Sequence, residues 1–273
     1  MTPLFEQLKQ RAADWNVAIG ETRETEGSLL GFGVSRSNPV VIKVSKYDDE
    51  SNSGEVLRAF EGAGVVKILE FVGGSVLLEQ LDPGKELVEL VREGRDEEAT
   101  TIFAQAIHRM ANHQPPAGCP TLFDWARGFD RYHEGPIPLQ LAQQAKEIYR
   151  RLAESQKQTM LLHGDLHHYN VLFDRKRGWI AIDPKGVVGE LEYELGAVIR
   201  NPVENPELYV SRDIVERRLK ALATALHLEY ERALGWSFAQ AVLSAIWSLE
   251  DGFFVTNDHP AIQLAREIQS MIN

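Results

Sequence analysis

The chain has 273 residues, of which 44% are hydrophobic and 25% are charged, and its formal net charge at pH 7 is −11. These values are ordinary for a globular protein and exclude a disordered chain. No apolar run approaches the ~20 residues that a membrane-spanning helix needs. The acidic balance argues against a nucleic-acid partner, because nucleic acids are bound through clustered Lys and Arg, and it is compatible with a cationic small-molecule ligand.

The single cysteine, Cys119, excludes an internal disulfide and indicates a reducing compartment. Residues 1–15 have an amphipathic pattern and lack the continuous apolar segment of a secretory signal. The sequence therefore predicts a cytoplasmic protein, and it is compatible with either a monomer or a homodimer.

Short apolar runs separated by turn residues fill the first ~80 residues, a pattern typical of strands. Residues 29–34 and 40–44 are rich in branched and aromatic side chains and predict a hairpin with its turn at Ser-Asn-Pro. Residues 55–64 predict a helix that ends at glycines, and residues 65–72 and 75–81 predict two further strands. This part of the chain is therefore expected to be a small β-rich lobe that carries one helix.

Helical periodicity dominates from Lys85 onward and continues through a final helical block at residues 207–272. The exception is residues 159–186, where short strand-like runs surround an Arg-Lys-Arg-Gly turn. Asp82-Pro83-Gly84 interrupts the pattern and predicts a boundary between domains 1–82 and 83–273. We expect an α+β protein with two lobes, a small β-rich N-lobe and a larger, mainly helical C-lobe, and a ligand bound in the cleft between them.

Polar residues gather at 163–170, between two predicted strands that would hold this loop rigidly. Asp165 is placed to accept a proton from a substrate hydroxyl. Asn170 and Asp183, the latter at the end of the next strand, offer the oxygen ligands that Mg²⁺ prefers. With ATP oxygens in the remaining positions, these residues predict a magnesium site for phosphoryl transfer.

The order of these residues matches the signature of kinases, which have a catalytic-loop Asp, an Asn five residues later and a metal-binding Asp after a hairpin. Upstream, Lys43 lies in a predicted strand and corresponds to the lysine that holds the α- and β-phosphates. Glu55, in the following helix, is the predicted ion-pair partner of Lys43, with Glu50 and Glu61 as alternatives.

The segment LLHGDLHHYNVL, together with RGWIAIDPKGVVGELEYELGAVIRNP, resembles the bacterial aminoglycoside and hydroxyurea antibiotic resistance kinases, particularly the streptomycin 6-phosphotransferase branch. EVLRAFEGAGVVKILE, LLEQLDPGKEL and WSFAQAVLSAIWSLEDG resemble that branch too. The resemblance implies a protein-kinase-like fold, ATP bound at a hinge near Glu79 and Leu81, and phosphorylation of a hydroxyl on a small molecule. Pro184-Lys185 follows Asp183 in place of Phe-Gly, a departure typical of these antibiotic kinases.

Several alternatives stay open. His163 and His167 are four residues apart, but that spacing brings zinc ligands together only on a helix, and this stretch is predicted to be a loop between strands. The resemblance to the antibiotic kinases implies instead that His163 orients the loop backbone. Residues 26–33 lack the full glycine-rich phosphate motif, and their glycines are also compatible with a twisted hairpin. Trp125, Trp236 and Trp247 are expected to be core residues.

The acceptor is less constrained by the sequence than the phosphate machinery. The candidate carboxylates for a cationic acceptor follow the catalytic hairpin or lie in the last helical block: Glu190, Glu192, Glu194, Glu250 and Asp251. Each is also compatible with a solvated helix face. The alternative functions are a kinase of hydroxyurea or of an endogenous sugar or amino alcohol, and an inactive kinase-like nucleotide-binding module.

Overall fold

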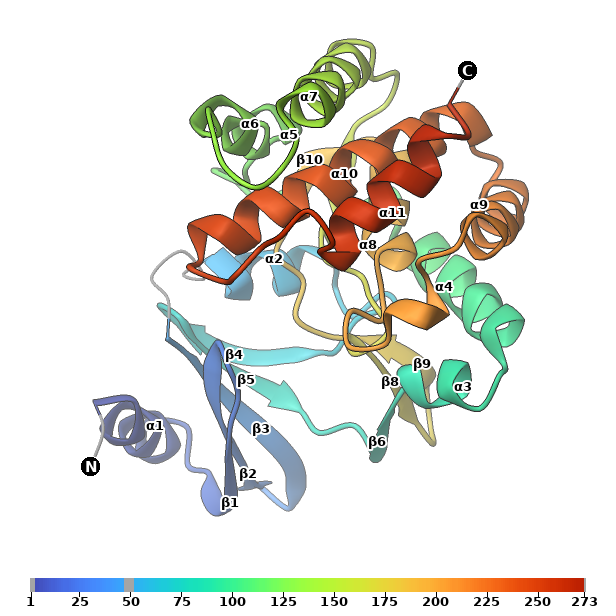
Figure 1. Cartoon of the computed structure of the whole chain (residues 1–273). Helices are drawn as coiled ribbons and strands as arrows, with labels where there is room; N and C mark the ends of the chain where they lie inside the picture. The colour runs from blue at the N-terminus through green and yellow to red at the C-terminus, as the bar shows by residue number, and fades with distance from the viewer. Residues whose placement is uncertain (1–2, 47–51, 273) are drawn as a thin grey trace.

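An antiparallel sheet of five strands forms the N-terminal part of the computed structural model, which describes residues 3–46 and 52–272 (Figure 1). Its spatial order is β1-β2-β3-β5-β4. The strands are β1 (Ala18–Glu24), β2 (Ser28–Ser35), β3 (Asn38–Ser45), β4 (Ile68–Val72) and β5 (Ser75–Glu79). We refer to this part, with helices α1 and α2, as the N-lobe.

Strand β3 has a period-2 burial pattern that decides where Lys43 lies. Val40, Ile42 and Val44 are buried on one face, where helix α1 (Pro3–Asp14) packs through Leu8. Because side chains alternate between the two faces of a strand, Lys43 lies on the opposite face. This face is turned toward the rest of the chain.

The hairpin predicted at residues 29–34 and 40–44 is confirmed as β2 and β3. Its turn lies one residue earlier than predicted, at Arg36 and Ser37, which have positive φ angles of 48° and 69°. Two such residues give a turn whose twist matches the strands, so Asn38 and Pro39 belong to β3 and not to the turn. Strand β1 was not predicted, because it is a mostly exposed edge strand without apolar alternation.

Helix α2 (Ser53–Ala59) is shorter than the helix predicted at residues 55–64. Beyond its end, Glu61 and Gly62 take positive φ angles of 52° and 74°, which a helix does not tolerate. Val56 and Leu57 of α2 pack into the large core of the C-terminal part and not into the cluster under the sheet. Helix α2 therefore connects the sheet with the rest of the molecule.

Two small sheets lie in the C-terminal part, which we call the C-lobe. One has the order β6-β8-β9 and the other pairs β10 with β7. The strands are β6 (Pro83–Glu86), β7 (Met160–Leu162), β8 (Val171–Asp174), β9 (Gly178–Ala181) and β10 (Val187–Gly189). The hairpin predicted around Arg-Lys-Arg-Gly is confirmed as β8 and β9.

Strands β6 and β10 were not predicted, because each is short and β6 lies where helical periodicity was expected to begin. The chain leaves the first sheet after Glu79 and joins the second at Pro83. This change of sheet falls beside the expected boundary at residue 82, and the division into two domains stays a prediction.

Helices make up most of the C-lobe, as predicted (Figure 1). They are α3 (Val88–Arg92), α4 (Asp96–Met110), α5 (Leu122–Trp125), α6 (Arg127–Arg131), α7 (Leu139–Glu154), α8 (Leu191–Ile199), α9 (Arg212–Leu226), α10 (Tyr230–Glu250) and α11 (Pro260–Gln269), with a short 3₁₀ turn at Pro206–Leu208. Helix α10 is buried along most of its length and packs against α7, α8 and α11. Within the described ranges, no helix combines the length and apolar character needed to cross a membrane.

The expected core role of tryptophan is confirmed for Trp236, which is fully buried in α10 and stacks edge-on against Tyr149 and Tyr193. Trp125 and Trp247 are only partly buried and meet edge-to-face with ring centroids 5.7 Å apart. These aromatic rings pack against the loop that carries Asp165, because Gly164 lies directly against Trp125.

Candidate active site

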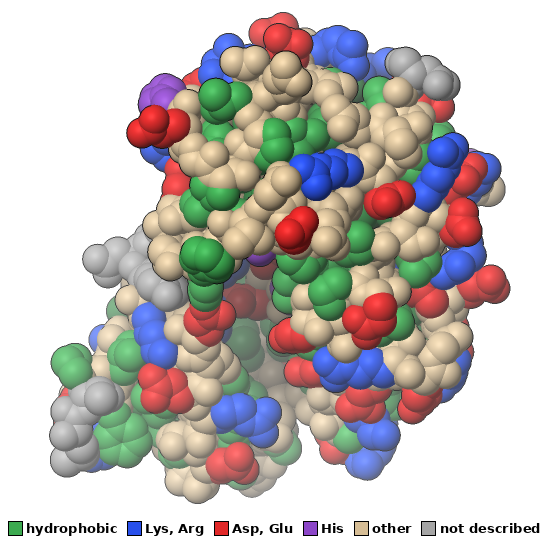
Figure 2. Space-filling view, in the orientation of Figure 1, with side chains coloured by type: hydrophobic (Ala, Val, Ile, Leu, Met, Phe, Trp, Pro, Cys, Tyr) green, Lys and Arg blue, Asp and Glu red, His purple; other side chains and the backbone are tan. Residues whose placement is uncertain are grey.

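A cavity of about 1250 Å³ lies between the two lobes. Figure 2 shows the surface hollowed between the sheet-containing part and the helical part. The N-lobe contributes Glu26 and Gly27 to its wall, and the C-lobe contributes Asp165 and Asp183. The structure thus brings two of the predicted site residues to one cavity at the place where the sequence predicted a ligand.

His163 is completely buried at the start of the loop that carries Asp165. Its Nε2 lies 2.9 Å from the carbonyl oxygen of Ile182, and its Nδ1 lies 3.3 Å from the backbone nitrogen of Asp165. Burial lowers the pKa of His163 to about 4, so the ring is neutral at pH 7, with Nε2 donating and Nδ1 accepting. This confirms that His163 orients the loop backbone.

Glu194 holds the same loop from helix α8. Its carboxylate accepts the backbone N–H groups of His163 at 2.7 Å and Gly164 at 3.1 Å. Burial raises the pKa of Glu194 to about 7, against the opposing effect of these hydrogen bonds. Glu194 is therefore a buried support of the loop, and the expectation that it binds an acceptor is wrong.

Of the other candidate acceptor carboxylates, Glu192 is partly exposed in the first turn of α8 and stays a candidate, and the remaining three differ in their contacts. Glu190 is buried and accepts hydrogen bonds from Arg232 and from the indole N–H of Trp236, so it too is unavailable to an acceptor. Glu250 forms a bidentate pair with Arg131. Asp251 lines the cavity and remains a candidate.

Asp165 lies at the cavity wall with about a quarter of its side chain exposed. Its Oδ1 accepts a hydrogen bond of 2.8 Å from Nη2 of Arg200, and Nε2 of His167 lies 3.5 Å from Oδ2. Burial alone would raise the pKa of this carboxyl, but His167 and Arg200 outweigh burial and hold the pKa well below its usual range. The residue is therefore an anion at neutral pH, able to accept a hydroxyl hydrogen.

Asn170 lies beside Asp165 with its amide group in a defined orientation. The amide nitrogen Nδ2 donates to the backbone carbonyl of Asp165 at 3.0 Å and lies 3.1 Å from Nε2 of His167. Because these contacts use the nitrogen, the oxygen Oδ1 is the atom that Asn170 offers to a cation. An amide oxygen fits the ligand preference of Mg²⁺.

Asp183 follows strand β9 and has a positive φ angle of 57°, a backbone conformation that few residues other than glycine adopt. Its carboxylate forms an ion pair with Lys43 of the N-lobe. Burial would raise the pKa of Asp183, but Lys43 and Lys185 outweigh it and lower the pKa. An ionised carboxylate at this point, held in a strained backbone, is suited to binding a cation.

The other residues predicted to bind the nucleotide, Glu55, Glu79 and Leu81, do not line the cavity. Glu55 has an exposed side chain in the first turn of α2, whereas the described carboxylate that pairs with Lys43 belongs to Asp183. Glu50, one alternative partner, lies outside the described residues. Glu79 accepts the backbone N–H of Lys67 at 2.9 Å and pairs with Arg177.

Leu81 is buried next to the segment that joins the lobes. Glu79 and Leu81 therefore flank the connection where the resemblance implies a nucleotide, and the binding roles of Glu55, Glu79 and Leu81 stay predictions.

Arg200 was not predicted, although it contacts the predicted base directly. It lies at the end of α8, 35 residues after Asp165 in the chain, within the segment that resembles the antibiotic kinases but outside the Asp-Asn-Asp spacing of the kinase signature. Only the packing of α8 against the loop that carries Asp165 brings the two side chains together, so the spacing of the kinase signature did not predict this pair.

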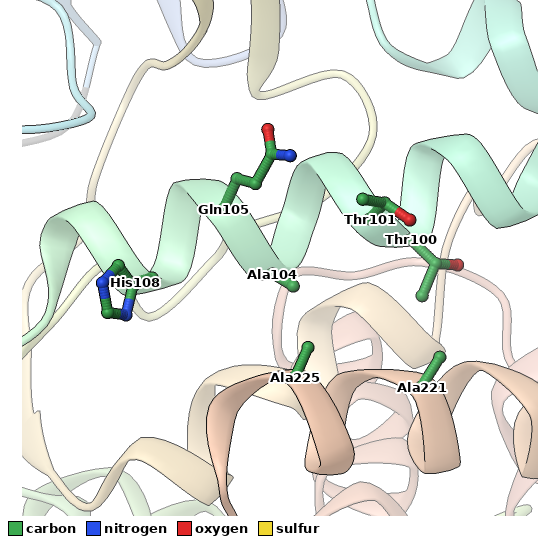
Figure 3. Close-up of a pocket in the computed structure, with 7 residues that line it drawn as sticks. All are labelled: Thr100, Thr101, Ala104, Gln105, His108, Ala221 and Ala225. Atoms are coloured by element: carbon green, nitrogen blue, oxygen red, sulfur yellow. The ribbon is translucent and has the colours of Figure 1, made fainter.

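A second, smaller cavity of about 340 Å³ lies between α4 and α9 (Figure 3). Its walls are Ala104, Ala221 and Ala225 with polar side chains of α4, and none of the predicted site residues lines it. Small side chains on two facing helices leave such a gap without any ligand, so the interlobe cavity is the candidate active site.

The interlobe cavity, the aspartates and the lysine are the parts of a two-lobed kinase, and comparison with known structures agrees. The fold is that of aminoglycoside phosphotransferase APH(4)-Ia, whose crystal structure in a ternary complex with ADP and hygromycin B superposes with a TM-score of 0.68 at 16% identity, covering 97% of each chain. At this identity the match establishes the protein-kinase-like fold.

The chain belongs to the aminoglycoside/hydroxyurea antibiotic resistance kinase family, whose profile matches residues 15–252. It is therefore a phosphotransferase that acts on hydroxyl groups. It is 31% identical to streptomycin 3''-kinase of Klebsiella pneumoniae over 85% of this chain and 88% of that protein. It is 28% identical to streptomycin 6-kinase of Streptomyces glaucescens, over 97% of this chain and 88% of that protein.

Proposed function

We propose that the protein uses Mg²⁺ and ATP to phosphorylate a hydroxyl group of an aminoglycoside-type antibiotic such as streptomycin. The observation that carries this proposal is the ion pair between Lys43 of the N-lobe and Asp183 of the C-lobe, at the cavity that Asp183 and Asp165 line. Phosphoryl transfer needs positioned charges more than covalent chemistry, and these three residues supply both signs of charge at one place.

In the proposed mechanism each residue has one task. Lys43, paired with Asp183 in this structure, turns to the α- and β-phosphates when ATP enters between the lobes. Asp183 and the amide oxygen of Asn170 would hold Mg²⁺, which supplies positive charge against the phosphate oxygens. Asp165 accepts a hydrogen bond from the acceptor hydroxyl, orients its oxygen toward the γ-phosphorus and takes its proton as transfer proceeds.

Binding of adenine near Glu79 and Leu81 would place the phosphates of ATP close to Lys43, Asp183 and Asn170. Glu55 is proposed as the residue that holds Lys43 once the carboxylate of Asp183 is engaged by the cation. An enzyme that draws on ATP and lacks disulfides is expected to act in the cytoplasm, as a monomer or a homodimer.

The acceptor is proposed to be cationic. Asp251, Ser244 and Ser248 line the cavity on its α10 side and offer hydrogen-bond acceptors to ammonium or guanidinium groups. A cavity of about 1250 Å³ accommodates both a nucleotide and a sugar-sized acceptor. Because relatives named for two different streptomycin hydroxyls match comparably, product analysis has to include both positions.

The test is an ADP-release assay with Mg·ATP and a panel of streptomycin, 2-deoxystreptamine aminoglycosides and hydroxyurea, followed by mass spectrometry of the products. We expect ADP release that depends on streptomycin and a product heavier by one phosphoryl group. The matched control is Asp165→Asn, which should bind nucleotide and release ADP no faster than without acceptor. If the wild-type protein shows no acceptor-dependent ADP release with any compound of the panel, the proposal of an antibiotic acceptor is refuted.

A second candidate is a kinase of hydroxyurea, which the family description itself includes, or of an endogenous sugar or amino alcohol. Turnover of hydroxyurea without turnover of streptomycin would favour it. An inactive nucleotide-binding module is the non-enzymatic candidate, and thermal stabilisation by Mg·ATP without turnover of any acceptor would favour that one.

A further inference from the structure

Arg200 lies where helix α8 ends, and its side chain reaches the wall of the interlobe cavity. Its Nη2 donates a 2.8 Å hydrogen bond to Oδ1 of Asp165, and the two side chains are 18% and 25% exposed. A charge-assisted bond of this length between half-buried groups fixes the torsion angles of a carboxylate.

The two oxygens of Asp165 are in different situations. Oδ1 accepts the hydrogen bond from Arg200, whereas Nε2 of His167 lies 3.5 Å from Oδ2, beyond ordinary hydrogen-bond length. The pairing with Arg200 therefore leaves Oδ2 as the oxygen that is presented to an acceptor hydroxyl.

A comparison with Arg218, a structural arginine of the same lobe, shows that Arg200 is not simply part of the core. Arg218 is 1% exposed, and its Nε, Nη1 and Nη2 all donate, to Asp96 and to the carbonyl oxygens of Asn201 and Leu208. Among the described residues, Nε of Arg200 is buried without a hydrogen-bond partner. Arg200 thus keeps an incompletely satisfied guanidinium beside the cavity, which folding stability alone does not favour.

We propose that Arg200 is a positioning residue of the phosphoryl transfer, which holds the Asp165 carboxylate in the orientation that receives the acceptor hydroxyl. This rests on the proposed function of Asp165 and adds a residue outside the kinase motifs. A planar guanidinium suits this positioning role because its N–H donors have fixed directions. The ammonium group of a lysine carries the same charge but directs its hydrogen bonds less strictly.

The experiment compares Arg200→Gln and Arg200→Lys with the wild-type protein on an acceptor that the wild type turns over. For Arg200→Gln we expect kcat to fall about 10²-fold, because a misoriented base loses near-attack geometry, while the KM for ATP changes less than about twofold. Arg200→Lys should retain part of the wild-type kcat, because lysine keeps the positive charge but lacks the planar set of N–H donors.

The matched control is Arg150→Gln. Nη2 of Arg150 donates to Oδ1 of Asp130 at the same 2.8 Å, but both side chains are about half exposed and lie away from the cavity. Breaking this pair should leave kcat and both KM values unchanged. A wild-type kcat in Arg200→Gln would overturn the proposal, as would an equal loss of kcat in Arg150→Gln.

A second measurement needs no acceptor and so separates this proposal from the proposed function. The melting temperatures of Asp165→Asn, Arg200→Gln and their double variant should be strongly non-additive, because Arg200→Gln alone leaves a half-buried carboxylate unpaired. The corresponding cycle for Arg150 and Asp130 should be nearly additive. Additive losses in the Arg200 cycle would mean that the pairing is absent in solution, and the positioning role would be lost with it.

Discussion

The catalytic loop of the C-lobe and the nucleotide-facing edge of the N-lobe are built in different ways. In the loop, His163 and Glu194 are buried and bind the backbone around Asp165, so the base is fixed from below before any ligand arrives. On the N-lobe side, Lys43 pairs with Asp183 of the C-lobe, and Glu55 is exposed on α2. In the proposed mechanism, this difference means that the core preorganises the acceptor side, whereas the contacts to the phosphates are completed only when ATP binds.

The largest effect is expected at Asp165. Asp165→Asn keeps the shape of the side chain but removes the basic oxygen, so kcat should fall about 10³-fold. Because Asp165 is held by the loop and not by the nucleotide, the affinity for Mg·ATP should stay nearly unchanged. Steady-state kinetics and nucleotide titration measure the two quantities, and wild-type turnover by this variant would remove Asp165 from its role as the base.

Glu194 tests whether the loop is preorganised by the core. Its folded-state pKa of about 7 lies above the ordinary value of 4.5, so the folded protein retains a proton that the unfolded chain releases. This contribution to stability is complete below about pH 4.3 and is lost as the pH rises through 7, a change on the order of 3 kcal/mol.

Glu194→Gln cannot titrate at this position, so its free energy of unfolding should depend less on pH between 4.5 and 7 than that of the wild type. Urea unfolding at a series of pH values measures the difference. Equal pH slopes in the two proteins would show that Glu194 does not carry the shifted pKa.

Lys43 tests the N-lobe side of the comparison. Lys43→Ala removes the positive charge that faces the phosphates, so kcat/KM for ATP should fall about 10²-fold, or about 2.7 kcal/mol. The melting temperature without nucleotide should also fall, because the Lys43 and Asp183 side chains are only 13% and 33% exposed and the variant leaves the Asp183 carboxylate without this partner. A fall in acceptor affinity with unchanged kinetics for ATP would contradict the proposed role.

The smallest effect is expected at Glu55. Its side chain is exposed, so Glu55→Gln should change the melting temperature by less than the error of the measurement. If Glu55 holds Lys43 only in the nucleotide complex, KM for ATP should rise about threefold, the effect of a partly exposed ion pair. An unchanged KM would assign the lysine partner to another residue.

The proposed catalytic residues could be predicted from the sequence because their spacing is local. Asp165 and Asn170 are separated by one loop and Asp183 by one hairpin, and short strands on either side fix their relative positions. Period-2 alternation gave the β2–β3 hairpin, and with it the position of Lys43. The helical character of the C-lobe followed from its apolar periodicity.

The sequence by itself therefore determined the fold class, the order of the chemical groups and the family. Only the tertiary structure decided that Glu190 and Glu194 are buried supports, that Arg200 meets Asp165, and that Asp183 pairs with Lys43. Local spacing determines which residues share a loop or a strand face. Burial and pairing depend on how distant elements such as α8, α10 and β3 pack together, and neither the composition nor the spacing of one segment contains that information.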